Sequence, residues 1–272
     1  MNPETQAAQA PQIPQAAQAP QAAIINTLPP SQTELPSLIV LASQSPRRKE
    51  LLLRAGISTY CIPSHINETK HVQESPKALV ERLAREKLLY VYDHFSALLA
   101  ANAQESTHAT SPAKTRTNPS ENAQTETETA LCAQLSSNPD KNFFLAADTI
   151  VWTEAGKVLG KPKDAADAKR KLSLLSDAKH HVSTAVYMRY QGISRSLIET
   201  TDVWFYPLSA QEIEAYVLSK DPMDKAGAYG IQGGAALFVE KISGNYENVV
   251  GLPLAHTVRA IRKLWQEGNR PK

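Results

Sequence analysis

The segment Leu38-Ile-Val-Leu-Ala-Ser-Gln-Ser-Pro-Arg-Arg48 places a short apolar run directly before a helix start. Residues 38–42 are continuously apolar, which is typical of a strand that is buried on both faces. Ser45 and Pro46 then fit the N-cap and the first position of a helix that is expected to end before Gly56. A buried strand followed at once by a helix predicts an α/β fold.

The same alternation of strand and helix signals continues along the chain. Residues 143–147 form a second apolar run, and residues 182–190 and 197–205 are β-branched stretches on either side of 191–196, which predicts a hairpin. Further helices are expected at 76–94, at 165–175, from Ser209, where Ser209 and Glu212 form a capping box, and from about Pro253.

Two stretches lack a sustained apolar pattern. Residues 1–37 repeat Ala, Gln and Pro, and residues 103–141 are rich in Ser, Thr, Asn, Gln, Ala and Pro. Such compositions bury too little apolar surface to offset the entropy cost of ordering the chain. We therefore expect a disordered tail at 1–37, one domain at 38–267, and a disordered surface insertion at about 103–141.

The charge balance and the cysteine content narrow the class of protein. The 272 residues include 29 basic and 27 acidic side chains, a net charge of +2, which argues against the cationic surface of a nucleic-acid-binding protein. Cys61 and Cys132 are too far apart in sequence to indicate a disulfide framework or a zinc site. No apolar run approaches the roughly 18 residues of a membrane span, and no basic side chain precedes Arg47. We expect a cytoplasmic protein without nucleic-acid or membrane partners.

Arg47 and Arg48 lie in the first turn of the helix that follows residues 38–42. The free backbone N–H groups and the positive dipole end of a helix start attract anions. Guanidinium groups can fork onto phosphate oxygens. A site for a triphosphate tail fits this pattern; a capped helix with two solvated arginines is the alternative.

Two carboxylates are candidates for catalysis and metal binding. Asp148 follows the apolar run 143–147, where a carboxylate is costly unless it holds a metal, pairs with a cation or caps a turn. Cleavage of a phosphoanhydride needs a divalent cation and an activated water, so Asp148 is the leading catalytic candidate. Glu68, in a loop-like segment, could share a metal with Asp148 or could be solvated.

Two lysines are candidates for binding phosphate. Lys87 lies four residues after Leu83, on the inward side of the helix expected at 76–94, where its ammonium either snorkels outward or meets an anion. Lys161 is fixed between Gly160 and Pro162, and an ordinary exposed turn lysine would give the same pattern.

Residues 224–234, Asp-Lys-Ala-Gly-Ala-Tyr-Gly-Ile-Gln-Gly-Gly, match neither a P-loop nor a dinucleotide fingerprint. Their glycines indicate a backbone that passes close to a flat or charged group. Tyr229 could then stack on a base and Gln232 could bond to it, although glycine turns beside a packed tyrosine would look the same. His180 and His181 have no acid at metal-binding spacing and are expected to be structural.

Seven motifs in this order resemble the Maf nucleotide pyrophosphatases. They are Leu-Ala-Ser-Gln-Ser-Pro-Arg-Arg-Lys-Glu-Leu-Leu, Leu-Ala-Arg-Glu-Lys, Ala-Asp-Thr-Ile-Val, Gly-Lys-Pro, His180-x-Val-x-Thr184, Lys-Ala-Gly-Ala-Tyr-Gly-Ile-Gln-Gly and Val-Val-Gly-Leu-Pro-Leu. The resemblance implies an elongated α/β fold similar to the house-cleaning inosine triphosphate pyrophosphatases. In that fold a twisted mixed β-sheet with flanking helices forms two lobes around a cleft. The tail and the insertion depart from the family pattern without interrupting a motif.

The resemblance also implies an activity and a set of site residues. The family hydrolyses nucleoside triphosphates between the α- and β-phosphates with a divalent metal cation, Mg²⁺ or Mn²⁺, and homodimers are usual in it. Its motif positions match Ser43, Arg47, Arg48, Glu68, Lys87, Asp148, Lys161 and Gln232 here. By this resemblance Asp148 and Glu68 hold the metal, Asp148 activates water, and the basic residues stabilise the triphosphate.

Three positions distinguish two branches of the family. Arg47, Thr149 and Gln232 resemble the branch that acts on dTTP and UTP. The branch that acts on 7-methyl-GTP carries an aromatic residue, Gln and Glu at these places. We therefore expect a dTTP/UTP pyrophosphatase that could also accept modified pyrimidine triphosphates. A 7-methyl-GTP pyrophosphatase and a nucleotide-binding regulator of cell division or septum formation are the alternatives.

Overall fold

The computed structural model of the protein describes residues 35–99 and 129–271. Its strands are β1 Leu38–Leu41, β2 Ser58–Cys61, β3 Phe143–Thr153, β4 Val158–Leu159, β5 Lys179–Tyr190, β6 Ile193–Phe205 and β7 Val239–Ser243. The α-helices that lie wholly within the described residues are α1 Pro46–Arg54, α2 Pro76–Asp93, α5 Ala165–Leu175, α6 Ala210–Leu218, α7 Tyr246–Val250 and α8 Leu254–Gly268. Short 3₁₀ turns are η1 Pro139–Lys141, η2 Asp221–Asp224, η3 Ala226–Ala228 and η4 Gly234–Phe238.

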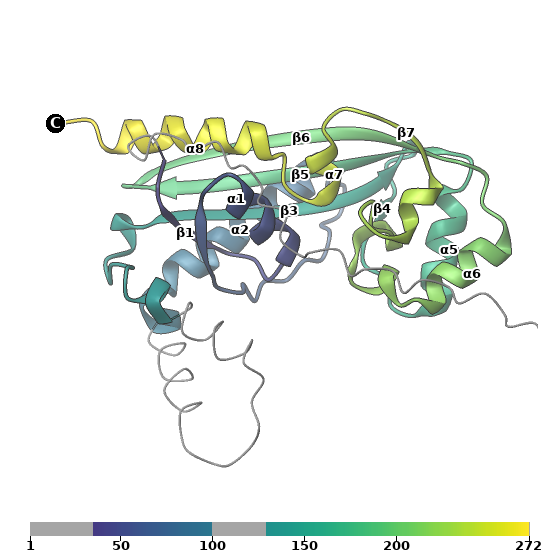
Figure 1. The fold of residues 1–272 in the computed structure, drawn as a ribbon, viewed down its shortest axis with the longest axis horizontal. Helices are drawn as coiled ribbons and strands as arrows, with labels where there is room; N and C mark the ends of the chain where they lie inside the picture. The colour runs from purple at the N-terminus through teal and green to yellow at the C-terminus, as the bar shows by residue number, and fades with distance from the viewer. Residues whose placement is uncertain (1–34, 100–128, 272) are drawn as a thin grey trace, which may run out of the picture.

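The strands form one mixed sheet in the order β2-β1-β3-β5-β6-β7, with β4 attached to β3. The strand pairs β1–β2 and β1–β3 are parallel, and the other pairs are antiparallel. The long strands β3, β5 and β6 run along the molecule and give it an elongated shape (Figure 1). The expectation of a mixed α/β sheet with flanking helices is confirmed.

Helices cover both faces of the first strands, which explains their continuous apolar sequence. Ile39 and Leu41 belong to the larger core together with residues of α1 and α8, whereas Val40 packs with Leu88 and Val91 of α2 on the opposite face. The same alternation runs along β3, because successive side chains of a strand point to opposite faces. Neighbouring residues of β3 therefore face different layers of helices.

A smaller lobe lies at the far end of the sheet, where α5, α6 and β4 gather (Figure 1). The larger core continues into this lobe without a break through Leu172, Ile213, Tyr216 and Phe238. Asp164 caps α5, and Ser209 and Glu212 form the expected capping box of α6. Because one core serves both parts, the lobes form a single folded unit.

The structure differs from several sequence expectations. β3 continues to Thr153 instead of ending at residue 147, and the hairpin turn is only Gln191 and Gly192, because β6 begins at Ile193. Of the insertion expected at 103–141, the described residues 129–141 include a helical turn and η1, and Leu131 and Leu135 pack against the second core. That part is folded, because its few apolar residues reach α2. Residues 1–34 and 100–128 lie outside the described residues, so the expectations for them stay untested.

None of the helices in the described part of the chain combines the length and the apolar composition that a membrane span requires.

Candidate active site

One edge of β3 is left bare between two neighbours. β1 pairs with β3 only as far as Leu145, and β4 pairs with β3 only at Val151 and Trp152. Among the described strands, none pairs with residues 146–150 on this side. A cavity of about 700 Å³ opens at the gap. Its walls come from the β1–α1 junction, α2, β3, η2 and the segments after β4, η3 and α7.

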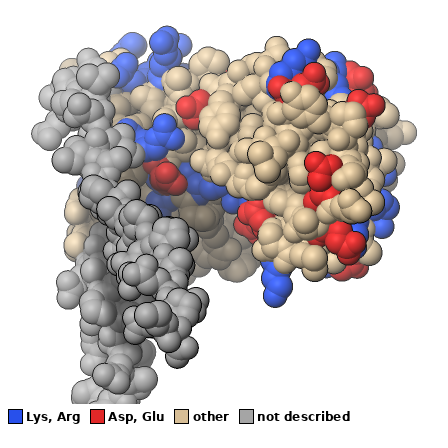
Figure 2. All heavy atoms as spheres, turned by 45° about the vertical axis from the view of Figure 1, so that its right-hand side comes forward, with Lys and Arg blue, Asp and Glu red and all other residues tan. Residues whose placement is uncertain are grey.

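All nine site residues expected from the sequence line this cavity. They are Ser43, Arg47, Arg48, Glu68, Lys87, Asp148, Thr149, Lys161 and Gln232. In the space-filling view, basic and acidic side chains lie in the hollow beside the small lobe (Figure 2). The fold therefore brings together residues that are separated by almost 190 positions in the sequence.

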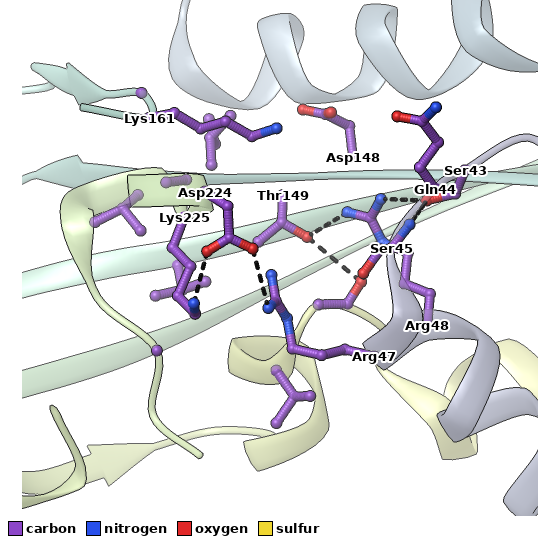
Figure 3. A pocket seen from close by; sticks show the side chains of 18 of the residues that line it. Ser43, Gln44, Ser45, Arg47, Arg48, Asp148, Thr149, Lys161, Asp224 and Lys225 are labelled. Atoms are coloured by element: carbon purple, nitrogen blue, oxygen red, sulfur yellow. Dashed lines mark hydrogen bonds and ion pairs between the residues drawn. The ribbon is translucent and has the colours of Figure 1, made fainter. Parts of the chain in front are cut away.

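Asp148 points to the α2 side of the sheet, where it meets Lys87. The Lys87 Nζ atom lies 2.5 Å from Asp148 Oδ1 and 2.7 Å from Glu68 Oε1. The side chains of Asp148 and Lys87 are 9% and 13% exposed, whereas that of Glu68 is 55% exposed. The Lys161 side chain extends toward Asp148 from the opposite wall (Figure 3). Two carboxylates and two ammonium groups thus face the same part of the cavity.

Glu68 is held as a carboxylate by these cations. Desolvation acts to raise its pKa, but the hydrogen bond and charge of Lys87, with the charges of Lys161 and Arg48, outweigh desolvation and leave the pKa below its ordinary value. Glu68 is ionised at neutral pH and available to a cation.

Thr149 points to the other side of the sheet, where it meets Arg48. Arg48 Nη2 donates to Thr149 Oγ1 at 3.0 Å, Nη1 donates to Ser43 Oγ at 3.1 Å, and Nε donates to the Gly251 carbonyl at 2.9 Å. Thr149 Oγ1 lies 2.9 Å from Thr184 Oγ1, which links the motif threonine of β5 to these bonds. Figure 3 shows the bond between Arg48 and Thr149. Arg48 joins β1, β3 and the α7 segment.

Arg48 therefore differs from a free phosphate-binding arginine. Burial lowers its pKa from the ordinary value, with Asp148 acting in the opposite direction. Three of its N–H groups already bond to protein acceptors. Arg48 thus shapes the cavity wall while Arg47 remains half-exposed. Phosphate binding by these arginines stays a prediction.

Arg47 reaches across the cavity toward the small lobe. Its Nη1 atom lies 3.7 Å from Asp224 Oδ2, a distance at the outer limit of an ion pair. Ser45 occupies the N-cap position of α1 but makes no side-chain cap hydrogen bond. The start of α1 and a loosely held guanidinium accordingly line the same cavity.

The Gly-rich segment contributes the Gln232 side chain to the cavity, but its tyrosine ring is not available to stack on a ligand. Gln232 is exposed and lines the cavity. Tyr229 is 6% exposed, its hydroxyl lies 2.9 Å from His180 Nε2, and its ring packs edge-on against Phe205. The suggestion that Tyr229 stacks on a base is wrong, because the ring is part of the core. His180 is structural, as expected.

The donor set suits a hard divalent cation. Within the described residues, no group of three or more His, Cys, Asp or Glu side chains is placed to hold a metal. Asp148 and Glu68 instead share one cation, the ammonium of Lys87. Mg²⁺ is commonly bound by one or two carboxylates, with water and substrate phosphates completing its ligands. The residues present fit such an ion.

Sequence reasoning missed several residues of the cavity wall. Asp224 and Lys225 stand inside the quoted Gly-rich motif but received no role, and the Gly251 carbonyl holds Arg48. The signal for Lys225 was its place between an aspartate and a glycine turn. No local signal could reveal Gly251, because it lies 203 positions from Arg48.

The fold and the cavity define an α/β protein with a cleft in which basic side chains from distant segments surround a carboxylate at the edge of a strand. Residues 38–264 match the family model described as Maf-like protein. The chain belongs to the Maf family.

Three curated relatives are similar over most of their length, and each is named dTTP/UTP pyrophosphatase. The Vibrio cholerae protein is 40% identical over 228 residues, which are 84% of this chain and 98% of the relative. The Citrifermentans bemidjiense protein is 41% identical over 235 residues, 86% of this chain and 98% of the relative. The Geobacillus protein is 36% identical over 226 residues, 83% and 97% respectively.

Proposed function

We propose that this chain is a nucleoside triphosphate pyrophosphatase that hydrolyses dTTP and UTP to the monophosphate and pyrophosphate. The observation that carries the proposal is the single cavity in which Asp148 and Glu68 face the same ammonium while Arg47 and Lys161 reach in from other walls. The names of the relatives support the choice of substrates.

The residues on the α2 side supply the chemistry. Asp148 is the candidate base that takes a proton from the attacking water, since its carboxylate is buried but opens onto the cavity. Lys87 pairs with this carboxylate and orients it. Lys161, for which the described residues show no ion-pair partner, can meet charge that develops on the phosphates. The Arg47 guanidinium can leave Asp224, 3.7 Å away, for a phosphate oxygen at small cost.

A divalent cation, Mg²⁺ or Mn²⁺, held by Asp148 and Glu68 is part of the proposal. When bound, it would neutralise phosphate charge and lower the pKa of a water molecule. On the other side of β3, Arg48 fixes Thr149 and Ser43, and Gln232 offers an amide to a pyrimidine edge. A cytoplasmic location and a homodimer are further parts of the proposal that rest on the family resemblance.

A triphosphate panel tests this function. The purified protein is given dTTP, UTP, CTP and 7-methyl-GTP with and without Mg²⁺, and pyrophosphate and orthophosphate are measured separately. We expect pyrophosphate from dTTP and UTP with Mg²⁺, and a loss of about 10²-fold or more in turnover for Asp148→Asn. Asp202→Asn, which alters a carboxylate paired with His181 away from the cavity, serves as the control. Orthophosphate as the product, or an Asp148→Asn variant near the full rate, would contradict the proposal.

The substrate panel and the Asp148→Asn variant also separate the alternatives. Preference for 7-methyl-GTP would assign the protein to the other branch. A role in division or septum formation that does not depend on hydrolysis predicts that overproduced Asp148→Asn binds dTTP and still alters division. If hydrolysis and the division effect disappear together, the regulatory alternative fails.

A further inference from the structure

Lys225 is enclosed beneath the Gly-rich segment of the cavity wall. Its side chain is 14% exposed, and its Nζ atom lies 2.6 Å from the Asp221 carbonyl oxygen, 3.0 Å from Asp221 Oδ1 and 2.6 Å from Asp224 Oδ1. One ammonium thus holds two carboxylates, and the cluster keeps a net negative charge. The other Asp224 oxygen faces Arg47, so the excess charge is directed at the phosphate-binding arginine.

A second branch of hydrogen bonds leads from Asp221 to the segment that carries Gln232. The Tyr216 hydroxyl donates to Asp221 Oδ2 at 2.6 Å and accepts from the Gly230 amide at 3.1 Å. Burial, together with this bond to Asp221, raises the pKa of Tyr216 well above its ordinary value, so the phenol stays protonated and keeps donating. An unbroken chain therefore links the Gly230 backbone to Lys225.

Two glycines rest directly on this cluster. A Cβ atom at Gly230 would lie 2.6 Å from Lys225 Cε, and a Cβ atom at Gly233 would lie 2.8 Å from Asp221 Oδ2. Both distances are shorter than real Cβ contacts, so a side chain at either position would displace the end of Lys225 or of Asp221. Gln232 lies between Gly230 and Gly233 in the sequence. The backbone of this segment therefore packs against the Lys225–Asp221 pair.

We propose that Lys225 is a positioning residue for substrate selection. Through Asp221 and Tyr216 it fixes the Gly230–Gly233 backbone and so the amide of Gln232. Through Asp224 it holds Arg47 beside the cavity until a phosphate takes the place of the carboxylate. The base end and the phosphate end of the cavity thereby both depend on the Lys225 ammonium. This inference rests on the proposed function, because it assumes that Gln232 contacts the base of a triphosphate.

The substitution Lys225→Met tests the inference, with Lys169→Met as a matched control. Lys169 pairs with Glu214 on the surface of the same lobe and does not line the cavity. We expect Lys225→Met to raise KM for dTTP and UTP about tenfold, with a smaller fall in kcat. The ratio of its kcat/KM for dTTP or UTP to its kcat/KM for 7-methyl-GTP should fall by a similar factor. Lys169→Met should stay within about twofold of the wild type. An unchanged preference in Lys225→Met would overturn the inference.

Tyr216→Phe tests the same chain with a smaller change, so a folding failure of Lys225→Met cannot hide the answer. It removes the hydroxyl between Asp221 and Gly230 and keeps the ring. We expect Tyr216→Phe to reduce the preference for dTTP and UTP over 7-methyl-GTP as Lys225→Met does. The double variant should be no worse than the more severe single variant, because both substitutions break the same hydrogen-bond chain. Fully additive effects would overturn the inference.

Hydrogen exchange at amides 229–234 separates this inference from the proposed function. Exchange should quicken in Lys225→Met or Tyr216→Phe and not in Lys169→Met. If exchange at these amides is unchanged in both variants, the positioning role of Lys225 is wrong, and this conclusion does not depend on which substrate the wild type hydrolyses. If these amides loosen but the wild type releases no pyrophosphate from any triphosphate, the proposed function fails and the support of this segment by Lys225 stands.

Discussion

Replacement of Lys87 by methionine should make the stability of the protein depend on divalent cations. The change removes the ammonium 2.5 Å from Asp148, whose side chain is only 9% exposed. Removing one partner of a buried ion pair costs about 3–5 kcal/mol, because the remaining charge is left uncompensated. Glu68, with a side chain that is 55% exposed, adds little to this cost. At roughly 2–4 °C per kcal/mol for a domain of this size, Tm should fall by roughly 6–20 °C.

Mg²⁺ should restore much of this loss, since a cation between Asp148 and Glu68 replaces the missing charge. Saturation at about 100 times its Kd would contribute about 2.7 kcal/mol. The assay is a thermal melt of Lys87→Met with a Mg²⁺ titration, repeated for the double variant Lys87→Met/Asp148→Asn. The double variant should regain stability without Mg²⁺, because no buried charge remains.

Lys171→Met provides the matched comparison. Lys171 Nζ lies 2.8 Å from Asp167 Oδ2, and the two side chains are 12% and 7% exposed, but neither lines the cavity. Its loss of stability should not respond to Mg²⁺. An equal rescue of Lys171→Met, or a Lys87→Met variant as stable as the wild type, would refute the reasoning.

Three further predictions concern stability and the segment that carries Glu68. Burial and the neighbouring His181 lower the pKa of His180 to about 3, so below about pH 6.5 the unfolded chain takes up a proton that the folded state refuses. Wild-type stability should therefore fall by about 1.4 kcal/mol per pH unit between those pKa values. His180→Gln should lose this slope in urea unfolding at pH 5 and 7, and an unaltered slope would exclude His180 as its source. Gly227→Ala should cost about 1–3 kcal/mol in the same unfolding measurement, because φ is +72° and a Cβ would lie 2.8 Å from a Val151 methyl; a cost below about 0.5 kcal/mol would contradict the packing argument. Arg82 bonds to Glu74 and to the Thr69 carbonyl in the segment that carries Glu68, so Arg82→Met should raise the Mg²⁺ concentration for half-maximal activity by several-fold, whereas an unchanged requirement would separate this anchor from the metal.

The elements with strong local signals were predictable from the sequence. α1 has Pro46 in its first turn, α6 has its capping box, and β1 is continuously apolar, so each lies where its pattern indicates. β2 and β7 were missed, because Ser-Thr-Tyr-Cys and Val-Glu-Lys-Ile-Ser carry no clear apolar period at an edge of the sheet. Their pairing is decided by the neighbouring strand.

The length of β3 shows why local patterns fail at the site. Asp148 and Thr149 looked like the end of a strand, since polar residues interrupt the apolar run. The strand continues because Lys87 satisfies Asp148 on one face and Arg48 satisfies Thr149 on the other. Both partners come from distant parts of the chain. The sequence could therefore nominate the residues of the cavity but not the partners that hold them.

Because the edge of β3 is unpaired at residues 146–150 among the described strands, Asp148 and Thr149 can each contact a ligand from a different face of the sheet. An extended ligand lying across that edge touches the strand from above and from below at once, with Asp148 on one side and Thr149 on the other. Substitutions at residue 149 and its neighbours can therefore change one face of the pocket without changing the contacts of Asp148 on the other face. Inserting a single residue upstream in β3 would exchange the two sides and remove both contacts together.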